Sequence, residues 1–257
     1  MAARQPTGSS SPESSLTVSV VIPVKDDATA LDTCLRLLQA QTLAPLEVIV
    51  VDNGSTDDSA AVGHRLGAIV IREPTPGIAA ASRAGYDRAT GDIIARLDTD
   101  TRVDPAWTAT ITRFLLGRPN VDAVTGPARF VDGPRMLRWP AAVVYLGAYY
   151  FVAGLTLTHM PLFGSNLAMR RAAWHDIRAS IHESDGLHDD FDLSFHLGRA
   201  HVIRFAHDLR VGISMRPLWD GGGRQRVARG FRTIATHWPD ELPWLRLARR
   251  LTDRGQK

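Results

Sequence analysis

The sequence predicts an α/β protein built on a Rossmann-like, doubly wound mixed sheet with helices on both faces. Apolar, β-branched runs at residues 16–24 (LTVSVVIPV) and 46–51 (LEVIVV) are typical of buried parallel strands. Between the two runs, four apolar side chains recur at the spacing of one helix face: Leu31, Cys34, Leu35 and Leu38. Strand, crossover helix and strand make a βαβ unit, and the alternation continues toward residue 100.

The other elements of this first half follow in order. A second helix is expected to begin at Asp57 and Asp58, because acidic side chains suit the positive end of a helix dipole. A strand at 68–71, a helix at 78–89 and a strand at 92–97 (DIIARL) complete the alternation. Ligands of such sheets bind at the carboxyl ends of the strands, so function is sought there first.

The second half is less regular. Asp104 and Pro105 are expected to start a helix, as an N-cap acid followed by proline at the first helical position. Trp107 is predicted to pack in the core, and residues 123–127 (AVTGP) are typical of a strand. Another helix is expected to begin within residues 187–193 (LHDDFDL), with a polar rim facing a cleft.

Composition indicates one folded main domain, because 44% of the 257 residues are hydrophobic and 22% are charged. Residues 1–15, rich in Ser, Pro and Ala, are expected to be a disordered leader and no signal peptide, and 16–215 the main domain. Residues 216–257 form a basic extension, whose partner could be phosphate, anionic lipid or solvent. Cys34 is the only cysteine, which excludes a disulfide within one chain and favours a reducing, cytoplasmic location.

Acidic residues follow three of the predicted strands. Asp26 and Asp27 follow the first, Asp52 the second, and Asp98 and Asp100 the strand at 92–97. Ordinary turn capping is one explanation, since turns favour Asp. Three such loops at one sheet edge would repel one another unless a cation compensates. The pattern therefore predicts a site for a hard divalent metal, Mg²⁺ or Mn²⁺, and a polar ligand.

The order of the motifs VVIPVKDD, VIVVDNGSTDD, ASRAGYDRATGD and IIARLDTDTRVDPAW resembles family 2 glycosyltransferases, which have the GT-A fold. The resemblance covers residues 16–215. It implies an inverting enzyme that transfers a sugar from a nucleotide-diphosphate sugar to an acceptor hydroxyl, with a divalent cation. Residues 16–104 would bind the nucleotide sugar and residues 105–215 the acceptor.

The same resemblance implies roles for single residues in the nucleotide-binding half. Those expected to bind the nucleotide sugar are Pro23, Val24, Asp27, Asp52, Arg83 and Asp98. Asp52 would accept a hydrogen bond from the base, and Asp98 would face the ribose and the metal. Asp100 would ligate the metal directly. Arg83 stands where many relatives have a different pair of residues, so its partner is either the diphosphate or solvent.

A second set of residues is implied around the acceptor. The segment PLFGSNLAMRRAAW resembles the family segment before the catalytic acid, and it offers Gly164, Ser165 and Asn166 to the acceptor side. Gln225 and Arg229 weakly resemble a Gln/Arg motif near the acceptor site in some relatives.

The motif HDDFDL resembles the family's Glu-Asp-x-Asp-Leu, with Asp189 in place of Glu, and Asp190 then matches the catalytic base. A sugar hydroxyl needs such a base, because it is a poor nucleophile while it keeps its proton. Neighbouring carboxylates are expected to raise the pKa of Asp190. Asp189 would have a supporting role. Simple N-capping of a solvated helix is the alternative.

Residues 139–169 contain no charged side chain, and their length would permit a membrane span. A span would separate the metal motif from the base, so either a membrane-surface helix or a plain core helix is expected. With the basic extension, this favours a peripheral protein whose acceptor is lipid-linked or belongs to the cell envelope; no nucleic acid is expected as a partner.

Histidines are not predicted to bind a metal, because His159, His182, His188, His207 and His237 lack zinc-like spacing. His188 is expected to shape the surroundings of the base.

Two other functions remain open. A sugar nucleotidyltransferase also combines an α/β sheet with acidic metal ligands, but its first strand leads into a glycine-rich phosphate loop and here leads into Pro-Val-Lys-Asp-Asp. The other is a catalytically silent protein that binds nucleotide sugars.

Overall fold

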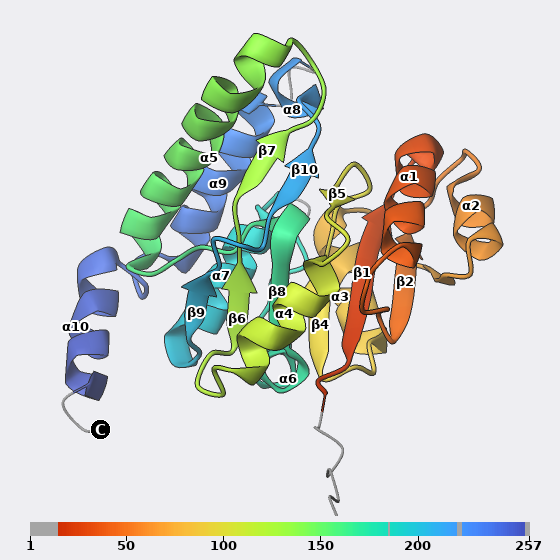
Figure 1. The fold of residues 1–257 in the computed structure, drawn as a ribbon. Coiled ribbons are helices and arrows are strands. Elements are labelled where there is room, and N and C mark those ends of the chain that lie inside the picture. The colour runs from red at the N-terminus through yellow and green to blue at the C-terminus, as the bar shows by residue number, and fades with distance from the viewer. Residues whose placement is uncertain (1–14, 185, 220–222, 255–257) are drawn as a thin grey trace, which may run out of the picture.

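A seven-stranded mixed sheet forms the centre of the protein (Figure 1). The computed structural model describes residues 15–184, 186–219 and 223–254, so residues 1–14 of the expected leader lie outside it. In spatial order the strands are β3 (Ile69–Arg72), β2 (Glu47–Asp52), β1 (Val18–Val24), β4 (Ile93–Arg96), β8 (Leu167–Arg170), β6 (Ala123–Thr125) and β9 (Ile203–Phe205). β8 runs antiparallel to both β4 and β6, and the other pairs are parallel. The predicted mixed α/β sheet is confirmed.

A small second sheet stands beyond the carboxyl edge of the central one (Figure 1). Its strands, in spatial order, are β5 (Arg102–Val103), β10 (Val211–Ile213) and β7 (Ala128–Phe130). β5 begins two residues after Asp100, so the acidic loop leads directly into this second sheet.

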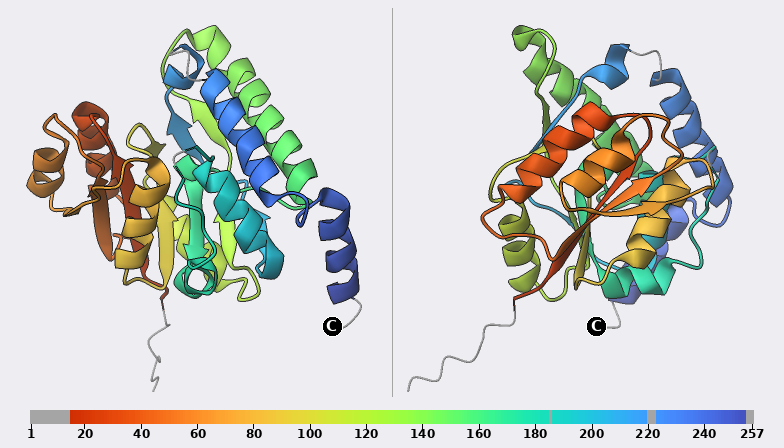
Figure 2. Two further views of the ribbon diagram at one scale, coloured as in Figure 1. Left: turned by 180° about the vertical axis from the view of Figure 1, so that it is seen from behind. Right: turned by 90° about the vertical axis from the view of Figure 1, so that its right-hand side faces the viewer.

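Helices cover both faces of the central sheet (Figure 2). The helices of the described residues are α1 (Ala28–Gln39), α2 (Ser59–Arg65), α3 (Ile78–Arg88), α4 (Trp107–Leu116), α5 (Arg135–Leu157), α6 (Arg171–Ile177), α7 (Asp189–Ala200), α8 (Arg216–Trp219), α9 (Gly223–His237) and α10 (Pro243–Arg254), with a 3₁₀ turn η1 at Gly164–Asn166. Alternate side chains of β1 point to opposite faces. Val20 therefore joins the core under α1 and α4, and Val21 joins the core under α3, α6 and α7.

Local sequence explains why these elements pack closely. Leu31, Leu35 and Leu38 of α1 are all buried, as their spacing predicts. In α3, a Cβ at Gly85 would lie 2.2 Å from a methyl carbon of Val21, so glycine is what lets this helix approach the sheet.

The expected helix start at Asp104 and Pro105 is wrong by two or three residues, since α4 begins at Trp107. Backbone oxygens of the preceding turn bind elsewhere: the carbonyl of Pro105 accepts a hydrogen bond from the Thr42 amide at 2.8 Å. Gln41 supplies the cap instead, because its Oε1 accepts from the Thr108 amide at 3.0 Å. The cap therefore comes from a residue remote in sequence.

The uncharged stretch forms most of α5, which buries one face and exposes the other. Ala142, Leu146 and Leu157 are buried, whereas Trp139 and Phe151 are 74% and 66% exposed. Among the described residues, α5 is the one helix that length and mean hydropathy would allow to cross a membrane. Such a test also admits core helices, so it is weak evidence for a span.

Candidate active site

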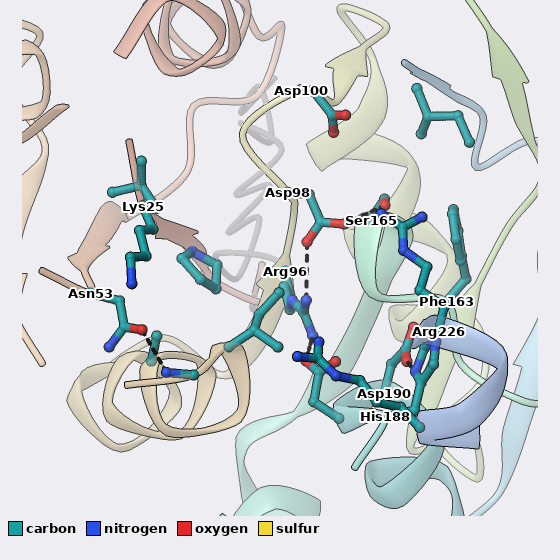
Figure 3. A pocket seen from close by; sticks show the side chains of 18 of the residues that line it. Lys25, Asn53, Arg96, Asp98, Asp100, Phe163, Ser165, His188, Asp190 and Arg226 are labelled. Atoms are coloured by element: carbon teal, nitrogen blue, oxygen red, sulfur yellow. Dashed lines mark hydrogen bonds and ion pairs between the residues drawn. The ribbon is translucent and has the colours of Figure 1, made fainter. Parts of the chain in front are cut away.

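A cavity of about 450 Å³ opens at the carboxyl edge of the central sheet (Figure 3). It is bounded on one side by the ends of β1, β2 and β4 and on the other by η1, α5, the start of α7 and α9. The predicted site residues that line it are Pro23, Val24, Asp98, Asp100, Ser165, Asp189, Asp190 and Arg229. The cavity thus joins the acidic loop to the start of α7, which is 89 residues further along the chain from Asp100 to Asp189.

On the nucleotide side, three predicted residues do not line this cavity. Asp52 is buried and its Oδ1 accepts a hydrogen bond from the Ser55 amide at 2.8 Å, so its own turn uses it. Its neighbour Asn53 lines the cavity instead. Asp27 binds Thr99 and Arg216, each at 2.7 Å.

Arg83 is the third of these residues, and it points to another part of the surface. Its guanidinium forms an ion pair with Glu183 and lies 3.8 Å from a carboxylate oxygen of Asp87. Nearby acids thus hold Arg83 in this structure, and its contact with the diphosphate stays a prediction.

On the acceptor side, Ser165 and Arg229 line the cavity, and the other predicted residues lie outside its lining. The Asn166 side chain is fully buried, accepts from the Trp107 indole at 3.0 Å and donates to the Leu209 carbonyl at 2.7 Å. It therefore supports the site from within the core. Gly164 acts through its amide, which donates to Asp190 at 2.7 Å, and the side chain of Gln225 is exposed outside the lining.

The acidic loop after β4 concentrates negative charge at one rim. Asp98 accepts a hydrogen bond from the Ser165 hydroxyl at 2.5 Å. Burial, reinforced by the charge of Asp98, raises the pKa of Asp100 to about 6, although Arg216 opposes the shift from 3.4 Å. The charge of Arg216 therefore only partly compensates the negative charge of this loop. The loop therefore fits a divalent cation, whose preferred protein ligands are carboxylate oxygens.

Arg96, which the sequence interpretation missed, lies at the centre of the site (Figure 3). Its side chain is 3% exposed, donates to Asp98 at 3.0 Å and forms an ion pair with Asp189. Burial alone would lower the pKa of Arg96, but Asp189 and Asp98 raise it well above the ordinary value, so it stays charged. Its signal in the sequence was a charged residue inside the apolar run IIARL.

The start of α7 holds the predicted base. His188, the N-cap residue, contacts the Asp190 carboxylate, and the amide of Gly164 donates to its other oxygen. Burial acts to raise the pKa of Asp190, but His188, Arg96 and the Gly164 amide together bring it below the usual range. The expectation of a raised pKa is wrong for Asp190, because these donors outweigh its acidic neighbours.

The neighbouring carboxyl of Asp189 shifts in the opposite direction. Its pKa is raised by burial and by the charge of Asp190, despite the ion pair with Arg96. The pKa values of these two adjacent carboxyls thus shift in opposite directions, and Asp190 has the lower proton affinity of the two.

Helices α5 and α9 close the far wall. Tyr145 and Tyr149 line it from α5, and Arg226 and Arg229 line it from α9. The Arg226 guanidinium donates to the Tyr145 hydroxyl at 3.1 Å. Part of the basic extension therefore belongs to the cavity, a placement that composition alone could not reveal.

Another part of that extension lies in the core. Arg246 is 4% exposed and donates to the Leu157 carbonyl at 3.0 Å, so it anchors α10 to the end of α5. The excess of basic residues is thus divided between a cavity wall, a buried anchor and the surface of α10.

Comparisons with known proteins agree with this architecture. Residues 19–177 match the model of "Glycosyl transferase family 2". An uncharacterized glycosyltransferase of Mycobacterium tuberculosis is 38% identical over 123 residues, which are 48% of this chain and 52% of the relative. A glycosyltransferase of Haloferax volcanii is 32% identical over 121 residues, 44% of this chain and 40% of that one. The chain therefore spans about half or less of the length of these relatives.

Solved structures share the fold. Glucosyl-3-phosphoglycerate synthase from Mycobacterium tuberculosis, in complex with Mn²⁺, UDP and glucosyl-3-phosphoglycerate, gives a TM-score of 0.60 at 21% identity over 86% of this chain and 79% of its own. A mannosyltransferase from Pyrobaculum calidifontis, in complex with GDP-Man and Mn²⁺, gives 0.58 at 21% identity, over 79% and 58%. The resemblance predicted from the strand-end motifs is confirmed by the family match, which covers more than half of the chain: the protein belongs to glycosyl transferase family 2.

Proposed function

We propose that the protein is an inverting glycosyltransferase that moves a sugar from a nucleotide-diphosphate sugar to an acceptor hydroxyl. One observation carries the proposal: a single cavity has an acidic, cation-demanding loop on one wall and the ionised carboxylate of Asp190 on the other. Relatives of the same fold were crystallised with UDP-Glc or GDP-Man together with Mn²⁺, which supports the donor class.

The donor would lie across the ends of β1, β2 and β4. Lys25 and Asn53 face this end of the cavity and offer an ammonium group and an amide to the nucleotide (Figure 3). Asp98 and Asp100 would hold Mg²⁺ or Mn²⁺, which when bound supplies positive charge to the departing diphosphate. Arg96 would keep Asp98 oriented, because its guanidinium is buried and donates to that carboxylate.

Asp190 would act as the general base on the acceptor side. As the acceptor oxygen bonds to the anomeric carbon, its proton passes to the Asp190 carboxylate, and the bond from that carbon to the diphosphate oxygen breaks. His188 and the Gly164 amide hold the carboxylate in place at the wall of the cavity. A single displacement of this kind inverts the anomeric centre and needs no second carboxylate as nucleophile.

We propose a lipid-linked or surface-bound acceptor at the cytoplasmic face of a membrane. Helices α5 and α9 both line the cavity, and they lie side by side (Figure 2). They and α10 bear exposed apolar side chains, among them Trp139, Val144, Phe151, Leu155, Val227, Phe231, Trp244, Leu247 and Leu251. Exposed apolar surface with basic residues is typical of helices that lie in a membrane interface.

One relative points the same way. An undecaprenyl-phosphate 4-deoxy-4-formamido-L-arabinose transferase of Sodalis glossinidius is 35% identical over 99 residues, which are 34% of this chain and 30% of the relative. A transferase that acts on a polyprenyl phosphate must work at a membrane surface. The basic wall formed by Arg226 and Arg229 suits an acceptor that contains phosphate.

Thermal unfolding with a panel of UDP-, GDP- and dTDP-sugars, with Mn²⁺ or with a chelator, tests the donor class. A ligand that binds only the folded state at about 100 times its Kd stabilises it by about 2.7 kcal/mol. We expect the sugars of one nucleotide to stabilise the protein, and only when Mn²⁺ is present. Asp100→Asn should abolish the effect, and Asp104→Asn, at an exposed acid just after β5, should preserve it.

The outcome also separates the competing functions. A glycosyltransferase is expected to hydrolyse the stabilising donor or to transfer its sugar to an acceptor. Release of pyrophosphate from a nucleoside triphosphate and a sugar phosphate would instead identify a nucleotidyltransferase. Binding without any turnover would leave a silent binding protein and refute the proposed activity.

A further inference from the structure

A second group of potential ligands lies on the side of α7 away from the cavity. Asp192 and His196, four residues apart, share one face of this helix, and His237 approaches them from the end of α9. His182 completes the group from the segment before α7. Asp192, His196 and His237 are buried, and the His182 side chain is 40% exposed, so the group has one opening to solvent.

Three imidazoles converge on a single oxygen atom. His182 Nδ1 and His237 Nε2 each lie 2.8 Å from Asp192 Oδ1, and His196 Nε2 lies 3.7 Å from it. His196 Nε2 is also 3.5 Å from His182 Nδ1, so two ring nitrogens face each other. The other Asp192 oxygen accepts from the His182 amide at 3.1 Å, which holds the carboxylate in its orientation.

Hydrogen bonds to Asp192 account for two of the three imidazoles but not for the third. Two N–H donors suffice for Asp192 Oδ1, and the nitrogen of His196 is then left to face another nitrogen. A tetrahedral Zn²⁺ about 2.0–2.1 Å from each ligand would separate the ligand atoms by about 3.3 Å. The measured separations of 2.8 to 3.7 Å lie on both sides of that value.

We propose that His182, His196, His237 and Asp192 form a structural Zn²⁺ site. Three imidazoles and one carboxylate make a full tetrahedral set with no position left open, as in metal sites that hold a fold together. The metal would tie α9 to α7. It would thereby fix the helix that starts at Asp189 and the helix that brings Arg226 and Arg229 to the cavity.

The sequence predicted no metal binding by histidines because they lack zinc-like spacing, whereas the fold gathers three of them around Asp192. Their positions at 182, 196 and 237 show no zinc-like spacing along the chain. The fold brings them together because α9 packs against α7, a contact that only the folded chain makes.

The test is metal content and coordination, measured on the full chain purified without a histidine tag. After zinc loading and exhaustive dialysis, we expect about one zinc ion per chain by mass spectrometry. Cobalt substitution should give the strong visible bands of tetrahedral Co²⁺. A chelator should lower the melting temperature of the wild type.

Variants assign the site. His196→Ala and, at the exposed edge, the milder His182→Gln should both lose the zinc and the cobalt bands. His175→Ala, an exposed histidine on α6, should keep both, and so should Asp100→Asn at the proposed donor-metal loop. If His196→Ala does not fold, His182→Gln still decides the question.

Three results would overturn the proposal: wild-type protein with little zinc and no tetrahedral cobalt spectrum, zinc retained in His182→Gln, or zinc lost equally in His175→Ala. None of these readouts depends on glycosyl transfer. Failure of the zinc site and failure of the proposed activity are therefore distinguishable.

Discussion

Replacing Arg96 by Met should destabilise the protein far more than removing any exposed arginine. Arg96 has a side chain that is 3% exposed and binds two carboxylates, Asp98 and Asp189. Met preserves much of the volume but leaves both acids without their cation. Removing one partner of a buried ion pair costs about 3–5 kcal/mol, because a charge then stays buried without compensation.

The assay is urea and thermal unfolding of Arg96→Met beside Arg83→Met. In a protein of this size each kcal/mol lowers the melting temperature by about 2–4 °C, so the expected loss is about 6–20 °C. Arg83 pairs with Glu183 at the surface, where the two side chains are 28% and 47% exposed. Such pairs contribute about 0–1 kcal/mol, so this control should lose little.

A double mutant identifies the cause. Adding Asp189→Asn to Arg96→Met should recover part of the stability, since a neutral amide no longer needs the cation. The loss should also shrink at acidic pH, because the pKa of Asp189 is already above its usual value and it protonates there. Equal losses in Arg96→Met and Arg83→Met, or no recovery in the double mutant, would refute the central role of Arg96.

Three further predictions concern the base, the acidic loop and the surface. Asp190→Asn should lower the transfer rate about 10² to 10⁴-fold with donor affinity preserved, and near-normal turnover would place the base elsewhere. Metal-free Asp100→Asn should be about 1–3 kcal/mol more stable than wild type at pH 8, because the folded pKa of about 6 exceeds the ordinary 3.8. This difference should disappear below about pH 4, where the carboxyl is protonated in both states; a gain that persists there would contradict the assignment to charge. Replacing Trp244 and Leu247 by Ser should weaken cosedimentation with anionic vesicles at low salt, and Leu46→Ser, on the loop before β2, should not; equal binding by all three proteins would exclude a membrane role for α10.

Features of short range were predictable. The buried strands β1, β2 and β4 follow from runs of β-branched residues, and α1 follows from helical spacing of its leucines. The meeting of the acidic loops at one edge also followed, because carboxyl ends of parallel strands share an edge. Asp98 and Asp100 are two positions apart in the sequence, so their common place in the cavity wall could be predicted without knowledge of tertiary contacts.

Features that depend on contacts between distant residues were not predictable. Asn53, rather than Asp52, reaches the cavity because Asp52 is used by its own turn. The lowered pKa of Asp190 depends on Arg96, which is 94 residues away in the chain, and on the Gly164 amide.

The basic residues and the histidines also show which features the sequence predicts and which ones tertiary contacts decide. Composition revealed a basic extension, but the fold sends Arg226 to the cavity and buries Arg246 against the end of α5. Likewise, His237 meets Asp192 across 45 residues because α9 packs on α7. Periodicity reports which face of an element is buried; it contains no information on which two faces meet, and at this site the partners of each charge set both proton affinity and metal binding.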